Sequence, residues 1–297
     1  MEQHITVRIN YLLKHLVPKV AYPLLLKYKY YIKMGKICNL TNPITFSEKV
    51  QWGKLHRDNK KLSDYADKIR VRDYAREVIG EEYLIPLVGS VYSSVDHIDF
   101  GSLPDQFVIK TNHGCGFNYI VKDKSLVDLD ELKKTVSQWM KIDYSYYGLE
   151  LQYRYIKPKI FVEKYLVQEG MTDLPDYKFF CFNGKVFCSY TMVNYAFDHS
   201  KGKLGFFDRD YKLMHCYRKD FEHLEDQLAK PKNYEIMVDL AEKLATGFSH
   251  VRVDFYNIEG EIFFGEMTFS NAGGFCRFEP EDFDRVLGEQ WNLNSGI

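Results

Sequence analysis

Two short stretches near the C-terminal end carry side chains that could bind a metal ion. Arg252 and Asp254 alternate with apolar residues, so both point to one face of a predicted strand. Glu266 and Thr268 have the same spacing in the next predicted strand. If these strands form a hairpin, the two carboxylates could share Mg²⁺, which takes few protein ligands and prefers substrate phosphates for the rest. The alternative is a patch of salt bridges between neighbouring strands.

The register of this hairpin decides whether the two pairs of side chains meet. A five-residue connection over residues 257–261 sets Arg252 opposite Glu266. Asp254 is then the diagonal neighbour of Glu266, with their Cβ atoms about 7–8 Å apart or less. A four-residue connection would turn the pairs to opposite faces, because side chains alternate along a strand. The predicted metal site therefore depends on the longer connection.

Lys110 ends a short apolar strand and leads into a loop that contains Gly114 and Gly116. Backbone N–H groups of such a loop can form an anion-binding nest, and glycine lets the main chain approach a phosphate. A lysine at the end of the strand adds a point charge suited to phosphate oxygens. The loop is not a P-loop, because the chain has no Gly-Lys-Ser/Thr sequence. The alternative is a hairpin loop with a surface lysine.

Two further predicted strands carry charged residues among apolar ones. Residues 160–166 are apolar except for Glu163, Lys164 and Tyr165, and this strand could hold adenine through its backbone and Glu163. The alternative is a half-buried edge strand. Lys178 stands on a strand that precedes Asn183-Gly184, the strongest short signal for a β-hairpin.

The elements that would position these residues follow an α+β pattern with antiparallel hairpins, without a regular alternation of strands and helices. The predicted strands are residues 107–110, 119–121, 160–166, 176–182, 185–193, 250–256 and 262–269. The predicted helices are residues 45–55, 67–78, 128–141, 234–245 and 281–291. Thr45 and Glu48 have the spacing of a capping box, which marks the first of these helices.

The order of these four features along the chain resembles that of the ATP-grasp superfamily. They are Lys110 with its glycine loop, the strand that could hold adenine, the strand that carries Lys178, and the paired carboxylates. More closely, the chain resembles the TupA-like ATP-grasp family, named for a teichuronopeptide-biosynthesis protein, from about residue 22 to residue 291. The stretches that carry the resemblance are 42–52 (NPITFSEKVQW), 66–68 (ADK) with 71–72 (VR), 103–110 (LPDQFVIK) with 112–114 (NHG), 176–184 (DYKFFCFNG), 251–256 (VRVDFY) and 265–269 (GEMTF).

The resemblance implies an ATP-grasp fold of the α+β class, in which two α+β subdomains hold ATP and Mg²⁺ between them. It implies a helical, basic and aromatic N-terminal region over residues 1–60. The N-terminal subdomain with a glycine lid would cover residues 61–167, and the C-terminal subdomain with the metal site would cover residues 168–297.

The resemblance also implies a role for each motif residue. The implied nucleotide contacts are Lys68, Lys110 and Lys178 at the phosphates, and Glu163, Lys164, Tyr165 and Leu166 at adenine. The implied lid is Gly114, Cys115 and Gly116. The implied catalytic residues are Arg252 and Lys178, and the implied metal ligands are Asp254, Glu266 and Thr268. Many ATP-grasp ligases have Asn where this chain has Thr268, which offers a single oxygen from a shorter side chain.

The reaction implied by the resemblance is ATP-dependent ligation. A carboxylate attacks the γ-phosphate of ATP to give an acyl phosphate and ADP, and an amine then displaces phosphate to form an amide. The family suggests cell-surface polysaccharide biosynthesis (capsule or teichuronopeptide), with a uronic-acid-type sugar or glycan and an amino acid or amine as substrates. Two alternatives stay open: a kinase of the same fold that phosphorylates a sugar hydroxyl, and a non-catalytic nucleotide- or glycan-binding partner of the kind labelled glycosyltransferase by genomic context.

Overall charge argues against a dedicated nucleic-acid binder, because 40 Lys and Arg stand against 41 Asp and Glu. Residues 1–36 are different, with seven basic residues against one acidic residue. This region is expected either to touch an anionic membrane surface or to pack on the body of the protein. We expect a cytoplasmic protein with reduced thiols, since no stretch approaches the ~18 apolar residues of a membrane span. If the basic N-terminal region touches lipid, the protein would be peripheral at the inner face of the membrane.

Overall fold

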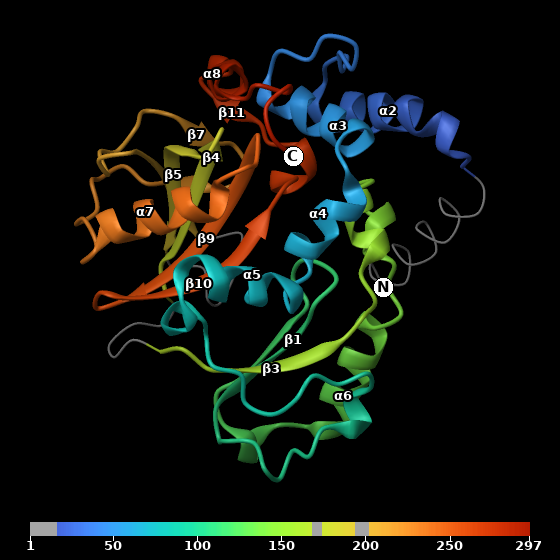
Figure 1. The fold of residues 1–297 in the computed structure, drawn as a ribbon, viewed down its shortest axis with the longest axis vertical. Helices are drawn as coiled ribbons and strands as arrows, with labels where there is room; N and C mark the ends of the chain where they lie inside the picture. The colour runs from blue at the N-terminus through green and yellow to red at the C-terminus, as the bar shows by residue number, and fades with distance from the viewer. Residues whose placement is uncertain (1–16, 168–173, 194–201) are drawn as a thin grey trace.

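The computed structural model describes residues 17–167, 174–193 and 202–297. Residues 1–16, which hold part of the predicted N-terminal helices, lie outside the described residues. Helices and antiparallel sheets are both present, so the predicted α+β class is confirmed (Figure 1). The sheets form two separate layers, one small and one large, with helices packed on each.

The small sheet has the order β2-β1-β3 and is antiparallel throughout. Its strands are β1 (Phe107–Thr111), β2 (Asn118–Val121) and β3 (Ile160–Lys164). The helix α6 (Leu129–Trp139) packs on it through Leu132 and Trp139, in a core that includes Ile109 and Val162. The chain around residues 87–92 pairs with the other side of β3, so β3 is not an edge strand.

The large sheet has the order β10-β9-β4-β5-β6-β8. Its strands are β4 (Asp176–Phe182), β5 (Lys185–Val193), β6 (Lys203–Asp208), β8 (Glu222–His223), β9 (His250–Ile258) and β10 (Glu261–Thr268). A separate pair joins β7 (Tyr217–Arg218) to β11 (Phe278–Glu279). The predicted hairpin at Asn183-Gly184 joins β4 to β5, and both residues have positive φ, as the tight turn requires.

Helices cover both faces of the large sheet (Figure 1). One face packs Phe179, Val253 and Phe255 against α4 (Asn59–Ala66), α5 (Arg70–Ile79) and α7 (Tyr234–Ala245). The other face packs Phe180 and Phe206 against α3 (Phe46–His56) and α8 (Asp282–Gln290). The predicted capping box begins α3: the Thr45 side chain accepts from the Glu48 N–H, and the Glu48 carboxylate accepts from the Thr45 N–H.

The cores divide the chain differently from the boundaries predicted at residues 61 and 168. Residues 61–79 were predicted to belong with the glycine loop, but α4 and α5 pack in the core of the large sheet. The apolar face of α5, with Val71, Ala75 and Ile79, is the physical reason, because it meets α7 and β10. The core of the small sheet begins only at about Val95.

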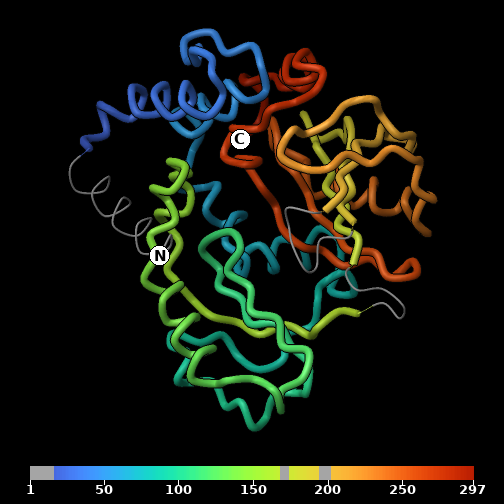
Figure 2. Tube along the Cα trace, turned by 180° about the vertical axis from the view of Figure 1, so that it is seen from behind, coloured from blue at the N-terminus to red at the C-terminus, as the bar shows by residue number. Residues whose placement is uncertain are grey.

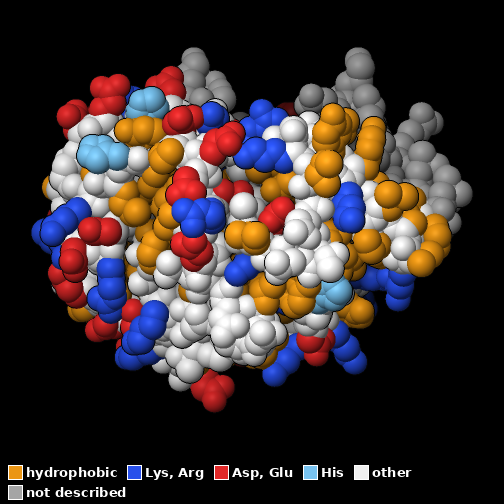
Figure 3. All heavy atoms as spheres, turned by 90° about the horizontal axis from the view of Figure 1, so that it is seen from above, with side chains coloured by type: hydrophobic (Ala, Val, Ile, Leu, Met, Phe, Trp, Pro, Cys, Tyr) orange, Lys and Arg blue, Asp and Glu red, His pale blue; other side chains and the backbone are white. Residues whose placement is uncertain are grey.

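The helix α2 (Tyr22–Met34) packs on the body through one face and exposes the others. Tyr22 and Leu26 lie against Tyr146 and Leu149, in the segment that rises from the small sheet (Figure 2). Outward-facing residues of the helix include Leu24, which is 72% exposed, and basic and apolar side chains are mixed on this side of the surface (Figure 3). Among the described residues no helix is long and apolar enough to cross a membrane.

Candidate active site

The β9–β10 hairpin differs in register from the prediction. The connection is the two-residue turn Glu259-Gly260, both with positive φ, and Asn257 pairs with Ile262. Continued without interruption, this short turn would set Asp254 opposite Gly265 and direct the two polar pairs to opposite faces. A bulge at Gly265 adds one residue, so Glu266 lies directly opposite Asp254.

The bulge brings the predicted metal ligands to the same face of the sheet. Thr268 lies opposite Arg252, next to the pair formed by Glu266 and Asp254. A Cβ built on Gly265 would lie 3.1 Å from the carbonyl oxygen of Asp254, so the bulge brings two backbones into close approach. The sequence contained this glycine, but hairpin length alone did not reveal its role.

Arg252 is the centre of an ion-pair cluster on this face. Its Nη2 lies 2.6 Å from Asp254 Oδ2 and 3.2 Å from Glu266 Oε1, and it donates to Thr268 Oγ1 at 3.0 Å. Its Nη1 donates to Asn271 Oδ1. Only 7% of Arg252 and 2% of Asp254 are exposed, so this network is buried.

Two predicted phosphate-binding lysines join the same cluster. Lys178 Nζ donates to Asp254 Oδ2 at 2.7 Å and also pairs with Asp176. Lys68 pairs with Glu266. Burial alone would lower the pKa of Lys178, but Asp176 and Asp254 outweigh burial and hold it well above its ordinary value.

Glu266 is ionised in this environment. Burial favours its neutral form, but the charges of Lys68, Arg252 and Lys178 dominate and hold the pKa of Glu266 far below its ordinary value. Glu266 therefore offers anionic oxygens directly opposite the carboxyl group of Asp254, with the Thr268 hydroxyl next to them. This donor set fits Mg²⁺, which prefers hard oxygen ligands and takes one or two carboxylates besides phosphate. The described residues contain no group of three or more His, Cys, Asp or Glu side chains that could hold a metal ion.

Lys110 and Glu163 lie in a second ion-pair cluster, on the small sheet. Lys110 Nζ is 2.6 Å from Glu163 Oε2, and Arg72 Nη1 donates to Glu163 Oε1 at 3.1 Å. Arg72 also donates to the Ile85 carbonyl, which fixes the guanidinium. The ion pairs of the described chain do not join this cluster to Arg252. The structure thus places the four predicted cations in two groups.

Some backbone groups of β3, the strand predicted to hold adenine, already form hydrogen bonds within the protein. The N–H of Lys164 donates to the Pro86 carbonyl at 2.9 Å, and Val162 accepts from Val88. Tyr165 and Leu166 follow the end of β3 and are partly exposed. Glu163 is buried and paired, whereas the sequence pattern suggested that its side chain would face the adenine base.

The glycine loop is held at its base and open at its tip. The backbone carbonyl of Asn112 accepts a hydrogen bond from the N–H of Lys68 at 3.2 Å. Its side-chain Oδ1 accepts one from the N–H of Lys159 at 2.7 Å. Gly114 packs so closely against the rings of Phe117 and Tyr144 that an added Cβ would clash. Cys115 and Gly116 are exposed at the tip.

A cavity of about 400 Å³ opens beside the Arg252 cluster. Its walls come from α2, from the tip of the glycine loop, from residues 144–153, from β9–β10 and from the turn at residues 270–275. Arg252, Glu266 and Thr268 form one wall. Asp176, Arg72 and the cavity residue Glu150 were not identified as site residues from sequence. Asp176 stands two residues before Lys178, and Arg72 falls in the stretch 71–72 that carries the family resemblance, but Glu150 belongs to no motif.

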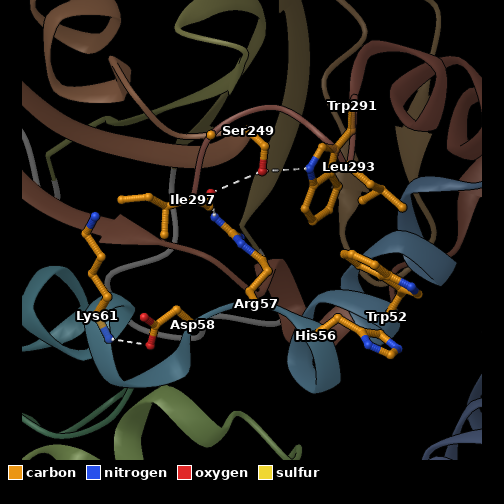
Figure 4. Close-up of a pocket in the computed structure, with 10 residues that line it drawn as sticks. Trp52, His56, Arg57, Asp58, Lys61, Ser249, Trp291, Leu293 and Ile297 are labelled. Atoms are coloured by element: carbon orange, nitrogen blue, oxygen red, sulfur yellow. Dashed lines mark hydrogen bonds between the residues drawn. The ribbon is translucent and has the colours of Figure 1, made fainter.

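A second cavity, of about 280 Å³, is lined by residues of α3, including Trp52 and His56, and by the C-terminal residues (Figure 4). Several of its polar groups form internal hydrogen bonds: Arg57 Nη2 donates to the Ile297 carbonyl at 2.7 Å and to the His250 carbonyl at 3.1 Å. Trp291 Nε1 donates to Ser249 Oγ at 3.1 Å. These bonds indicate a role in packing the C-terminal residues against the body of the protein.

The comparison with protein families agrees with the motif analysis. The family model described as TupA-like ATPgrasp matches residues 48–292. No curated protein matches the chain. Similar solved structures include D-alanine–D-alanine ligase from Bacillus anthracis complexed with ATP, with 14% identity, a TM-score of 0.39 and coverage of 69% of this chain and 55% of that one. Another is the ADP complex of PurK, N5-carboxyaminoimidazole ribonucleotide synthetase, with 14% identity, a TM-score of 0.43 and coverage of 75% and 50%.

A third is the ATP-grasp ligase PsnB with its minimal precursor, with 11% identity, a TM-score of 0.39 and coverage of 71% of this chain and 54% of that one. The chain spans about half the length of these structures.

Proposed function

The chain belongs to the TupA-like ATP-grasp family, as its match over residues 48–292 shows, and we propose that it is an ATP- and Mg²⁺-dependent carboxylate–amine ligase. The fold is the α+β ATP-grasp fold, and the cofactors of the family are ATP and Mg²⁺. Formation of an amide bond through an acyl phosphate, and a uronic-acid-type sugar as the carboxylate, are the finer parts of this proposal.

The observation that carries the proposal is the pair formed by Asp254 and Glu266. These carboxylates lie directly opposite each other on adjacent strands, and one nitrogen of Arg252 contacts both. Such an arrangement holds two ionised carboxylates at close range despite their repulsion. Bound Mg²⁺ would supply positive charge at the transferring phosphoryl group.

The cations of the cluster are suited to phosphate oxygens. Lys68 and Lys178 are ion-paired with carboxylates, so each holds its charge in a partly buried place. Each can exchange a carboxylate for a phosphate oxygen and remain paired. Arg252 lies deepest and keeps its fork of donors facing the reacting groups, which suits stabilisation of charge on the acyl phosphate. Positioning and electrostatics supply most of the catalysis in phosphoryl transfer.

The test is ADP release in the presence of Mg²⁺ and ATP. Uronic acids, uronic-acid oligosaccharides and sugar nucleotides are offered with and without each amino acid. A ligase releases ADP and phosphate only when both a carboxylate and an amine are present. ADP release without an amine, with a phosphorylated sugar as product, would identify the kinase instead. No ADP release, together with measurable ATP binding, would identify a binding protein.

We place the protein at the inner face of the membrane, in keeping with polysaccharide synthesis. Support comes from the outer face of α2, where Leu24 and Tyr31 are exposed beside Lys27. Sedimentation with vesicles that contain anionic phosphatidylglycerol tests this placement. Binding that disappears in phosphatidylcholine vesicles and in the variant Leu24→Ser would support it, and equal sedimentation with both lipids would refute it.

A further inference from the structure

Glu150 is a buried carboxylate that faces the 400 Å³ cavity. It is 8% exposed and lines the cavity beside Arg252 and Glu266. Its side chain makes no hydrogen bond or ion pair with any described residue. Burial, with repulsion from Glu266, raises the pKa of Glu150 to about 7 against the attraction of Lys54. A carboxylate in such a place is stabilised by a cation that enters the cavity.

The backbone before Glu150 is held in an unusual conformation. Leu149 has φ of 54°, a value that leucine rarely adopts, and its side chain is fully buried against Tyr22 and Leu26 of α2. Lys54 Nζ donates to the carbonyl of Gly148 at 2.7 Å and fixes the same turn. Packing and hydrogen bonds therefore determine where Glu150 points. Strain of this kind is commonly held at functional positions.

Two lysines on α2, Lys29 and Lys33, also line the cavity. Lys29 Nζ donates to the Tyr147 carbonyl at 3.1 Å, and Lys33 Nζ lies 4.9 Å from the centre of the Phe275 ring. Neither has a carboxylate partner in the described part of the chain. They lie one helical turn apart, so their charges repel, and burial followed by repulsion from Lys33 lowers the pKa of Lys29. An anion between them would relieve this repulsion.

Among the described residues, one cavity thus presents a carboxylate without a hydrogen bond or ion pair and two lysines without carboxylate partners, next to the Arg252 cluster. We infer that this cavity binds an amino acid as the attacking amine, with its ammonium group at Glu150 and its carboxylate at Lys29 and Lys33. The inference rests on the proposed ligase function for its chemical step. It names the second substrate class and a residue that touches that substrate.

The chemical step is a proton transfer followed by acyl transfer. Glu150 accepts a proton from the ammonium group, which leaves a neutral amine with a free electron pair. The nitrogen forms a bond with the acyl carbon, and the bond from that carbon to the phosphate oxygen breaks. Phosphate leaves with the bonding pair and takes the second proton from nitrogen, while Glu150 releases the first proton to water.

Binding tests the site without any turnover. Calorimetry measures the affinity of each standard amino acid for the full chain in the presence of Mg²⁺ and a non-hydrolysable ATP analogue. The amino acid that binds most tightly is then compared with its N-acetyl derivative, which has no ammonium group, and with its amide, which has no carboxylate. We expect each derivative to bind at least about tenfold more weakly, as loss of one charged contact predicts.

Variants assign the two ends of the ligand. Glu150→Gln should weaken binding of the amino acid but not binding of its N-acetyl derivative. The double variant Lys29→Ala with Lys33→Ala should weaken binding of the amino acid but not binding of its amide. Lys27→Ala is the matched control, because Lys27 lies on the outer face of α2, and it should bind as the wild type does. Absence of binding by every amino acid, or equal binding by Glu150→Gln, would overturn the inference.

Turnover separates this inference from the proposed function. Hydroxylamine is mostly neutral at pH 7 and traps an acyl phosphate as a hydroxamate. We expect Glu150→Gln to lower amino-acid-dependent ADP release by about 100-fold, the scale of a lost proton acceptor, and to lower hydroxamate formation far less. An equal loss of ADP release and of hydroxamate formation would refute the role of Glu150 but leave the ligase function intact. Absence of hydroxamate in the wild type would refute the ligase itself, while the binding results would still stand.

Discussion

The Arg252 cluster and the Glu150 cavity are adjacent, but they differ in whether their charged side chains form ion pairs. In the cluster Lys68, Lys178 and Arg252 are each paired with a carboxylate. In the cavity the side chains of Glu150, Lys29 and Lys33 form no ion pair with a described residue, although the charge of Lys54 attracts Glu150. Burial is similar for Glu150 and Arg252, at 8% and 7% exposed, so the difference lies in pairing.

The difference separates a site organised in advance from a site completed by its ligand. The paired cluster is held by strong mutual attractions, so its geometry exists before ATP and Mg²⁺ arrive. The cavity holds charges that only an incoming molecule can neutralise. The same side-chain types therefore have opposite effects on stability: removing a paired charge should destabilise the fold, and removing the unpaired one should stabilise it.

The largest expected effect is on the paired side. Lys178→Met leaves Asp176 and Asp254 buried without their shared cation. Loss of one partner of a buried pair costs about 3–5 kcal/mol in the free energy of unfolding. Urea denaturation measures this loss, with Lys185→Met as control, because Lys185 is 77% exposed although it also forms an ion pair. A loss below that of the control would contradict the comparison.

Glu266→Gln tests whether the paired carboxylates bind metal. The change keeps the shape of the side chain but removes the charge that Mg²⁺ requires, so ATP turnover should fall by at least about 100-fold. Glu261→Gln, on the same strand and exposed, is the matched control. Steady-state ADP release at several Mg²⁺ concentrations measures both. Full activity in the Glu266 variant would remove Glu266 from the metal site.

Glu150→Gln should have the opposite sign in a stability measurement. The pKa of Glu150 is raised from 4.5 to about 7, so its ionisation destabilises the folded chain increasingly from pH 4.5 and fully above pH 7. Lys54 and Glu266 are the charged groups that face it. The variant should therefore be more stable than the wild type by about 1–3 kcal/mol at pH 8, and about equal at pH 4.5. A destabilised variant at pH 8 would indicate a hidden partner of Glu150.

The smallest effect is expected at the second paired cluster. Lys110→Ala removes one of the two cations that contact Glu163, and Arg72 remains. Nucleotide affinity should fall by about tenfold, the value of one charge-assisted contact. Calorimetry with ADP and Mg²⁺ measures it. Unchanged affinity would separate Lys110 from the phosphate site.

The sequence predicted the strands, and which side chains share a face of a strand, better than the connections between strands. Alternation along β9 and β10 placed Arg252 with Asp254 and Glu266 with Thr268, and β4–β5 followed from Asn183-Gly184. The hairpin register was wrong, because a tight turn and the bulge at Gly265 shift it in ways that counting loop residues cannot detect.

Residues that act through tertiary packing were not predictable. Glu150 lies in irregular chain after α6, and only the packing of α2 on Leu149 turns it toward the cavity. Arg72 lies on an ordinary amphipathic helix, and only the folded structure shows that its guanidinium group pairs with Glu163 on the small sheet. No local pattern assigns a site role to either residue, because their contacts come from distant parts of the chain.

Acyl-phosphate formation is the central claim, and hydroxylamine trapping tests it most directly. The wild-type chain is incubated with Mg²⁺, ATP, hydroxylamine and the uronic-acid panel, and ADP and hydroxamate are quantified together by mass spectrometry. The account predicts equal amounts of ADP and hydroxamate with a uronic acid, and neither product in Glu266→Gln. ADP with a phosphorylated sugar and no hydroxamate would contradict it.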